Sequence, residues 1–199
     1  LLKGENTTNS TLRINGHIDA QGKVVFSTFN QLTQYRRVVK ETHKVHDSVK
    51  QSSFFGLKNK TQSIEREVEI YKAEPGNTVN GSEVVYEDIT HVQQSGLTIT
   101  AGIGGVHTEN VEVIEQRALI ETGIKANVAR NRGLLGGSII TTQEETYNLI
   151  PTVINSTGPV QLHSEVGCYD NLVINGKPVI DSALALESSH LHSGHALTM

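Results

Sequence analysis

The sequence is poor in the residues that build disulfide frameworks, metal clusters and thick aromatic cores. Its one cysteine, Cys168, excludes an internal disulfide and any zinc site made of several cysteines, and we expect a small buried apolar thiol there. Tryptophan is absent, and only 5% of the 199 residues are aromatic. This composition is thin for an enzyme with a deep core, yet too apolar for a disordered chain.

The sequence also lacks a strong excess of positive or negative charge, and it lacks long apolar runs. The formal net charge of −4 has no strong sign, so no nucleic-acid partner or acidic membrane surface is indicated. No apolar run reaches the length that spans a membrane, and the first residues do not form a signal peptide. The chain begins at Leu1 rather than Met, so we expect it to be a piece of a longer protein.

Short β-branched runs bounded by Gly, Asn or Asp dominate what is present. Each is four to eight residues long and has the residue types of a strand, and helical periodicity is weak. Representative runs are 11–15, 23–28, 97–100 and 138–142.

Several of these runs share one pattern, in which an apolar residue is followed by a turn with Gly and then a short strand. It recurs at 14–24, 79–84, 94–102 and 173–180. Strands this short cannot stabilise a sheet alone, but stacked at about twenty residues per turn they bury one another in a coil of roughly ten layers. Such a narrow core needs aliphatic residues and few aromatics, which fits the composition.

The segment 35–74 departs from this pattern and predicts an antiparallel hairpin. Its first arm is basic and its second is acidic, so opposed charges can pair across the two strands. We predict a register in which Lys40 faces Glu69 and Lys44 faces Glu65. The same register sets three apolar pairs, Val38 with Tyr71, Val39 with Ile70 and Val45 with Ile64.

The far end of this hairpin has the sequence KQSSFFGLKNKT, with Phe54, Phe55 and Leu57 among polar residues. These side chains either pack back onto the arm or a neighbouring layer, or stay exposed for contact with a partner. If the protein binds a partner through this segment, we expect these three residues to make the contact.

The phrases NGHIDAQGKVVF, ETHKVHDS, SSFFGLKNKT, GNTVNGSEVVYEDI and QQSGLTITAG resemble the filamentous-haemagglutinin repeat. That repeat occurs in large bacterial exoproteins of two-partner secretion systems, including adhesins and contact-dependent growth-inhibition effectors. The resemblance covers residues 12–115 and is looser beyond them. It implies a right-handed parallel β-helix forming the stalk of a secreted, cell-surface filament. It also implies an outer-membrane transporter as partner during secretion, and a receptor on a target cell.

Nine histidines raise the question of a metal site, and the densest group is His190, His192 and His195. Alternation along a strand would place His190 and His192 on one face, and imidazoles bind zinc or copper, but no carboxylate lies within the group. A polar tail without metal is the alternative.

No catalytic residue is predicted. The glycine-rich stretches 102–105 and 133–137 lack the dinucleotide and P-loop fingerprints, so we interpret them as tight turns. The acids Asp88, Glu165, Asp170 and Asp181 are scattered along the sequence, whereas enzymes that cleave sugars bring carboxylates together in one groove.

The sequence therefore predicts an all-β, right-handed parallel β-helix with a protruding antiparallel hairpin. Layers are expected at 1–34, the hairpin at 35–74 and further layers at 75–199, all in one structural domain, and no role is assigned to 165–199. The expected function is that of a rod segment in adhesion or contact-dependent toxin delivery, with no cofactor, no small-molecule substrate and no nucleic acid. Two alternatives stay open: a polysaccharide-acting enzyme on the same scaffold, and a binding module that uses the hairpin tip or the histidine-rich segment.

Overall fold

The computed structural model describes residues 2–3, 10–53, 60–133, 136–184 and 191–193. Every regular element in these ranges is a β-strand, as the sequence predicts. The chain divides into two compact units. Unit 1 comprises 1–37, 74–119 and 149–199, and unit 2 comprises 38–73 and 120–148. Within the described ranges, no helix is long and apolar enough to cross a membrane.

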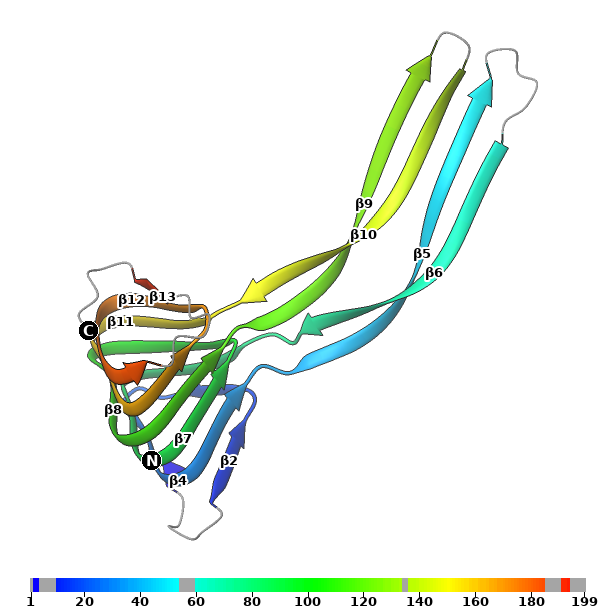
Figure 1. The fold of residues 1–199 in the computed structure, drawn as a ribbon. Coiled ribbons are helices and arrows are strands. Elements are labelled where there is room, and N and C mark those ends of the chain that lie inside the picture. The colour runs from blue at the N-terminus through cyan, green and yellow to red at the C-terminus, as the bar shows by residue number, and fades with distance from the viewer. Residues whose placement is uncertain (1, 4–9, 54–59, 134–135, 185–190, 194–199) are drawn as a thin grey trace. The chain divides into compact units, whose positions relative to one another are not determined.

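Unit 1 is built on a parallel sheet (Figure 1). Its strand order among the described residues is β1-β4-β7-β8-β11-β12-β13, with β2 beside β4 and β3 beside β7. The strands are β1 (Leu2–Lys3), β2 (Thr11–Ile14), β3 (His17–Asp19), β4 (Lys23–Tyr35), β7 (Asn77–Ser95), β8 (Leu97–Arg117), β11 (Thr152–Tyr169), β12 (Leu172–Leu184) and β13 (Leu191–Ser193).

The long strands of unit 1 are longer than the four to eight residues that the sequence suggested, because separate runs join through bends. β8, for example, has 21 residues. Three of these bends lie at aligned positions of neighbouring strands. Thr28 of β4, Asp88 of β7 and Asn110 of β8 are level with one another in the strand register, and their φ angles are positive, at 63°, 53° and 52°. β7 also folds back on itself, since the Tyr86 hydroxyl lies 3.0 Å from Gln94 Nε2. Eight positions of straight strand would span about 26 Å.

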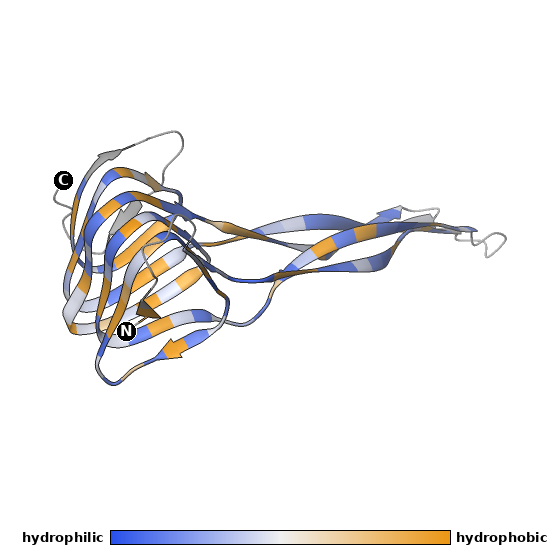
Figure 2. Ribbon diagram, turned by 90° about the horizontal axis from the view of Figure 1, so that it is seen from below, coloured by the Kyte–Doolittle hydropathy of each residue, from blue (hydrophilic) through white to orange (hydrophobic). Residues whose placement is uncertain are grey.

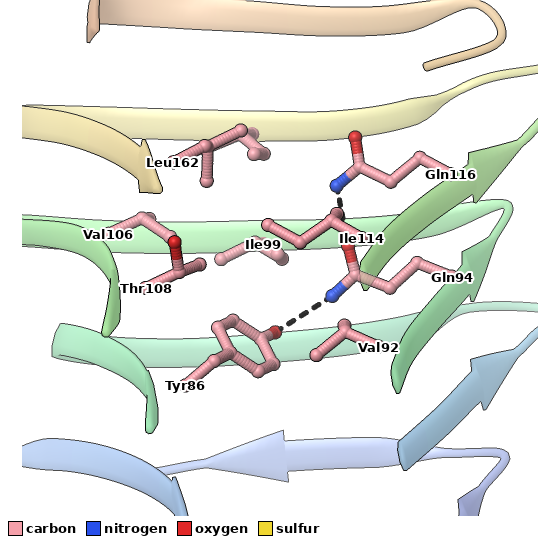
Figure 3. Close-up of a pocket in the computed structure, with 10 residues that line it drawn as sticks. Tyr86, Val92, Gln94, Ile99, Val106, Thr108, Ile114, Gln116 and Leu162 are labelled. Carbon is pink, nitrogen blue, oxygen red and sulfur yellow. Dashed lines mark hydrogen bonds between the residues drawn. The ribbon is translucent and has the colours of Figure 1, made fainter. Parts of the chain in front are cut away.

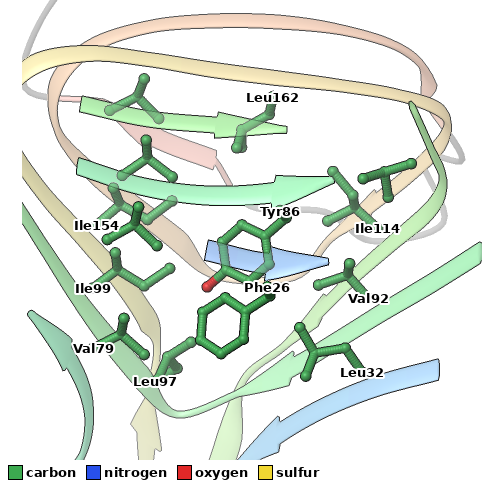
Figure 4. Packing of buried hydrophobic residues seen from close by; sticks show 14 of the residues in the cluster. Phe26, Leu32, Val79, Tyr86, Val92, Leu97, Ile99, Ile114, Ile154 and Leu162 are labelled. Carbon is green, nitrogen blue, oxygen red and sulfur yellow. The ribbon is translucent and has the colours of Figure 1, made fainter. Parts of the chain in front are cut away.

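The core of unit 1 is a slim column of buried aliphatic side chains with few aromatics. Hydrophobic and polar residues alternate along its strands, so one side of each strand turns inward (Figure 2). Phe26 of β4 stacks on Tyr86 of β7 with 5.0 Å between ring centroids, and aliphatic residues such as Ile99 and Ile154 surround them (Figure 4). The expectation of an aliphatic interior is confirmed.

Two glycines occupy backbone positions where a side chain would be strained or would clash. Gly96 has a φ of 59° in the one-residue gap between β7 and β8, at a turn that the sequence marks as Ser95-Gly96. Gly105 has a φ of 81°, and a Cβ there would overlap the carbonyl oxygen of Pro159 on β11. The stretch 102–105, predicted as a turn, instead lies within β8.

Unit 2 is a four-stranded sheet in the order β6-β5-β10-β9, which groups β5 (Val38–Ser53), β6 (Lys60–Ala73), β9 (Leu119–Gly133) and β10 (Gly136–Ile150) (Figure 1). β5 and β6 form the predicted antiparallel hairpin.

The predicted register of this hairpin is wrong by two residues. Lys40 faces Tyr71 and Lys44 faces Glu67, so the predicted apolar pairs do not oppose one another. The two charge pairs nevertheless form along the diagonals, with 2.7 Å between Lys40 Nζ and Glu69 Oε1 and 3.1 Å between Lys44 Nζ and Glu65 Oε1. Long flexible side chains reach a diagonal neighbour, so charge pairing alone does not determine a register.

The second hairpin, β9 and β10, was not recognised in the sequence, where its residues were assigned to further layers. β10 pairs with β5 in antiparallel fashion from Ser48↔Thr141 to Ser53↔Gly136. Val45, Val68 and Ile70 of the first hairpin form a small buried cluster against Ile124 of the second. The chain is therefore an all-β protein with a long parallel sheet and a smaller antiparallel one.

Candidate functional site

The predicted contact residues Phe54, Phe55 and Leu57 lie outside the described residues. The structure does describe the strands on either side: β5 ends at Ser53 and β6 begins at Lys60. Close to these ends in the sheet is an open depression of about 370 Å³, lined by Gln51 of β5 and by small or polar residues of β9 and β10, namely Asn131, Gly133, Gly136, Gly137 and Ser138. Its lining offers hydrogen bonds rather than an apolar pocket.

The predicted histidine cluster is described only at one position. His190 and His195 lie outside the described residues, and the backbone of His192 in β13 pairs with Val173 of β12. Across the described part of the chain, no three His, Cys, Asp or Glu side chains are grouped so that they could hold a metal ion.

A wider groove crosses the outer surface of unit 1, where β8, β11 and β12 lie side by side. Its volume is about 530 Å³, and it contains two acids that the sequence left scattered, Glu165 and Asp181, together with Glu112 and His163. Asn110, Val111 and Ser164 complete the lining. Strand stacking therefore gathers residues that lie up to about seventy positions apart in the sequence.

A bulge in β11 forms one wall of this groove. The pairing of β11 shifts between His163 and Val166, so Ser164 and Glu165 project from the strand. Thr108 of β8 stabilises the start of the bulge, because its hydroxyl donates to the His163 carbonyl at 2.7 Å and accepts from the His163 amide at 2.6 Å. His163 Nδ1 lies 3.5 Å from Asp181 Oδ2 on the neighbouring strand.

The chemistry available in the groove is that of an exposed acidic surface. The Asp181 side chain is 82% exposed and that of His163 is 46% exposed, so water screens both charges. The groove can accept hydrogen bonds from hydroxyl groups and attract cations weakly. It lacks the enclosure that strengthens electrostatic catalysis in a dry active site.

One face of unit 2 carries a ladder of exposed ion pairs. The hydrogen bond from Lys40 lowers the pKa of Glu69 below its ordinary 4.5, and the same bond raises the pKa of Lys40 above 10.5. On the other face, hydrogen bonds from His43 and then Lys72 lower the pKa of Glu41. His43 bonds Glu41 on its own strand, with 3.0 Å between His43 Nε2 and Glu41 Oε2.

A buried polar column is the feature of unit 1 that sequence reasoning missed. Gln34, Gln94 and Gln116 stack at aligned positions of β4, β7 and β8 and are at most 2% exposed. Gln94 Nε2 donates to Gln34 Oε1 at 2.7 Å. Figure 3 shows the next bond of the column, in which Gln116 Nε2 donates to Gln94 Oε1 at 2.6 Å. Tyr86 also donates to Gln34, at 3.0 Å, and burial raises the pKa of its phenol.

The column borders an enclosed cavity of about 10 Å³, which is too small for a substrate (Figure 3). The sequence carried one signal of the column: each glutamine follows an apolar residue by two positions, as in Leu32-Thr33-Gln34. In the structure each is the second-to-last residue of its strand.

Comparison of the chain with protein-family models, with curated proteins and with solved structures found no match. Proposals about function therefore rest on the sequence and on the geometry described above.

Proposed function

We propose that unit 1 is a run of layers from a right-handed parallel β-helix, and that the chain is a rod segment of a secreted, cell-surface filamentous exoprotein. The observation that carries this proposal is the similar spacing between paired residues along the chain. Thr78 pairs with Thr98 and Val153 with Val173, in each case 20 positions apart. Tyr86 pairs with Thr108, 22 positions apart.

The spacing stays similar where unit 2 interrupts the chain. Phe26 pairs with Tyr86, 60 positions apart, and removing the 36 residues of 38–73 leaves 24. Thr98 pairs with Val153, 55 positions apart, and removing the 29 residues of 120–148 leaves 26. Each hairpin is thus an insertion into one turn of a repeating unit, as expected for a solenoid with excursions.

Contacts inside unit 1 support a coil rather than an open sheet. Tyr86 and Gln94 come from one strand and meet inside the core, which requires the strand to turn around that core. Crossover connections between parallel strands are right-handed in nearly all proteins, which agrees with the handedness that the haemagglutinin-like resemblance implies.

A rod function agrees with the tight packing beside the glutamine column, where the cavity of about 10 Å³ leaves no room for a substrate. In this proposal unit 1 gives length and stiffness, and unit 2 presents the segment with Phe54, Phe55 and Leu57 to a target-cell receptor in adhesion or toxin delivery. An outer-membrane transporter would export the chain.

The test of location uses intact cells of the producing bacterium and an epitope tag in unit 1 of the full-length protein. External protease should remove the tag from cells that have the outer-membrane transporter and should spare it in cells without it. A periplasmic protein serves as the control for intact envelopes. A tag that stays protected in both strains would contradict the proposal.

A second candidate function is polysaccharide binding or cleavage in the groove of unit 1, favoured by the carboxylates of β8, β11 and β12 that line it. It predicts release of reducing ends from an acidic or neutral polysaccharide, with loss of that activity in Glu165→Gln and Asp181→Asn. If no polysaccharide binds or is cleaved, this candidate is excluded.

A further inference from the structure

The two outermost strands of unit 2, β6 and β9, are the edges of its four-stranded sheet. At the base of β6 the outward amides are already satisfied by side chains of β9 from the same chain: the amide of Tyr71 donates to Thr122 Oγ1 at 2.8 Å and that of Ala73 to Glu121 Oε1 at 2.9 Å. From Thr61 to Glu69, the described pairings give β6 no neighbour other than β5. That stretch therefore presents unpaired backbone groups, which can template another strand.

The free stretch of β6 carries a row of acids on one face. Glu65, Glu67 and Glu69 alternate along the strand and share the face of Lys40 and Lys44. Lys44 and Lys40 pair with Glu65 and Glu69, whereas Glu67 is exposed and has no ion pair among the described residues.

This face can be followed across the sheet by the register. Glu67 faces Lys44 of β5, and further along β5 Ser48 faces Thr141 of β10. Directly opposed residues in antiparallel strands lie on the same face. The acidic face of β6 therefore continues through the even-numbered residues of β5 to the odd-numbered residues of β10.

The opposite edge carries cations on that same face. Asn148 of β10 donates to Glu121 of β9 at 3.2 Å, so even-numbered residues of β10 share a face with odd-numbered residues of β9. Arg130 and Arg132 of β9 consequently belong to the face of Glu67. Both are exposed and have no ion pair among the described residues.

Strand direction allows the two edges to join between copies. β6 and β5 are antiparallel, as are β5 and β10. β9 ends at Gly133 and its neighbour β10 begins at Gly136, and so short a connection makes them antiparallel too. β9 therefore runs opposite to β6, and β9 of one copy can pair in antiparallel fashion with β6 of the next by a simple translation.

We propose that unit 2 associates with unit 2 of a second copy of this chain, β6 of one against β9 of the other. The pairing would put Glu67 beside Arg130 and Arg132 and continue the antiparallel sheet, repeating the way β5 and β10 already join two hairpins. The acidic row disfavours β6 against a second β6, because like charges directly opposed are destabilising. The contact is head to tail, so it extends a row of copies rather than closing a dimer.

The experiment measures self-association of the full chain by analytical ultracentrifugation at low and high ionic strength. We expect association at low ionic strength that weakens as salt is added, since exposed ion pairs are screened. Glu67→Lys alone, and Arg130→Glu with Arg132→Glu, should each weaken association about tenfold. Circular dichroism verifies that each variant is folded.

The decisive sample is an equimolar mixture of the two charge-reversed chains. In this mixture the β6 strand made basic by Glu67→Lys can pair with the β9 strand made acidic by the two arginine substitutions. The unchanged β6 and β9 strands of the two chains can also pair with each other, so association should return. Lys125→Glu is the matched control, because it makes the same change on the other face of β9 and should alter association by less than about twofold. The proposal is overturned if the chain stays monomeric at low ionic strength, if charge reversal has no effect, or if the mixture associates no better than each variant alone.

Discussion

Gln94 shows how a single polar side chain is held inside a narrow aliphatic core. It is 2% exposed and hydrogen-bonds Gln34, Tyr86 and Gln116 from three strands. Buried amides cost free energy unless they are paired, and stacking identical side chains at one position pairs each with the next. The column therefore also selects the register of the parallel strands, because a slip by one residue would unpair it.

Replacing Gln94 with Leu should reduce the free energy of unfolding by about 2–3 kcal/mol, because Gln34 and Gln116 lose buried partners. Chemical denaturation measures the effect. Gln93→Leu is the matched control: the neighbouring side chain points outward and bonds Glu115, and its loss should cost no more than about 1 kcal/mol. Equal effects at the two positions would show that the column does not stabilise the fold.

The backbone of Thr28 is strained, whereas the residues at the aligned bends of β7 and β8 are not. A β-branched residue at a φ of 63° is a rare combination, whereas Asp88 and Asn110 at the aligned bends are residue types that tolerate this conformation.

Thr28→Asn should therefore raise the free energy of unfolding by about 0.5–1 kcal/mol, measured by chemical denaturation. Thr98→Asn, at a half-buried position without positive φ, should not stabilise. A loss of stability in Thr28→Asn would mean that the hydroxyl contact with Ser27, at 3.0 Å, outweighs the strain.

The β5–β6 hairpin is the element whose existence was predictable and whose register was not. A basic arm followed by an acidic arm with alternating apolar residues indicates an antiparallel pair. Lys40 reaches Glu69 in either register, so the charges did not discriminate. The structural register instead buries Val45, Val68 and Ile70 against Ile124, which belongs to a hairpin some fifty positions further on. Local sequence carries no information about that contact.

Charge pairing on this hairpin should give unit 2 a defined pH range of stability. The lowered pKa values of Glu69 and Glu41 contribute stability above pH 4.5 that is lost as pH falls through their folded-state values. The raised pKa of Lys40 contributes stability below pH 10.5 that is lost as pH rises through its folded-state value. Hydrogen exchange of unit 2 amides between these limits and below pH 4.5 measures the difference, and unchanged protection at acidic pH would contradict it.

A charge swap tests the diagonal pair directly. Lys40→Glu and Glu69→Lys should each destabilise the hairpin, and the double variant should recover most of the loss. Swapping Lys23 and Glu83, which pair at 3.2 Å in unit 1, is the control and should leave unit 2 unaffected. A double variant no more stable than either single one would show that the two side chains do not interact in solution.

The two units differ in how much apolar surface they bury. The cluster of unit 1 runs through β4, β7, β8, β11 and β12, whereas that of unit 2 consists of Val45, Val68 and Ile70 with Ile124 beside them. Large side chains of the second hairpin remain exposed, including Tyr147 at 70% and Val128 at 55%. Local stability follows buried apolar contacts, so the units should open with different free energies.

Hydrogen exchange followed by mass spectrometry should detect this difference within one sample. Amides in peptides from 78–95 and 97–117 should exchange slowest, and those from 120–133 and 136–148 should exchange much faster. Uniform protection across both sets would mean that the chain unfolds as one cooperative body.

The amino-acid pattern alone was enough to predict the all-β class, the aliphatic character of the core, the bend at Gly96 and the presence of a charged hairpin. These features follow from residue types and short-range alternation, which act within a few positions of the chain. Four further features are visible only in the folded chain: the hairpin register, the second hairpin beside it, the glutamine column and the groove that gathers Glu165 and Asp181. Each of these depends on which strands become neighbours, and residues twenty to a hundred positions apart meet only when the strands have been stacked.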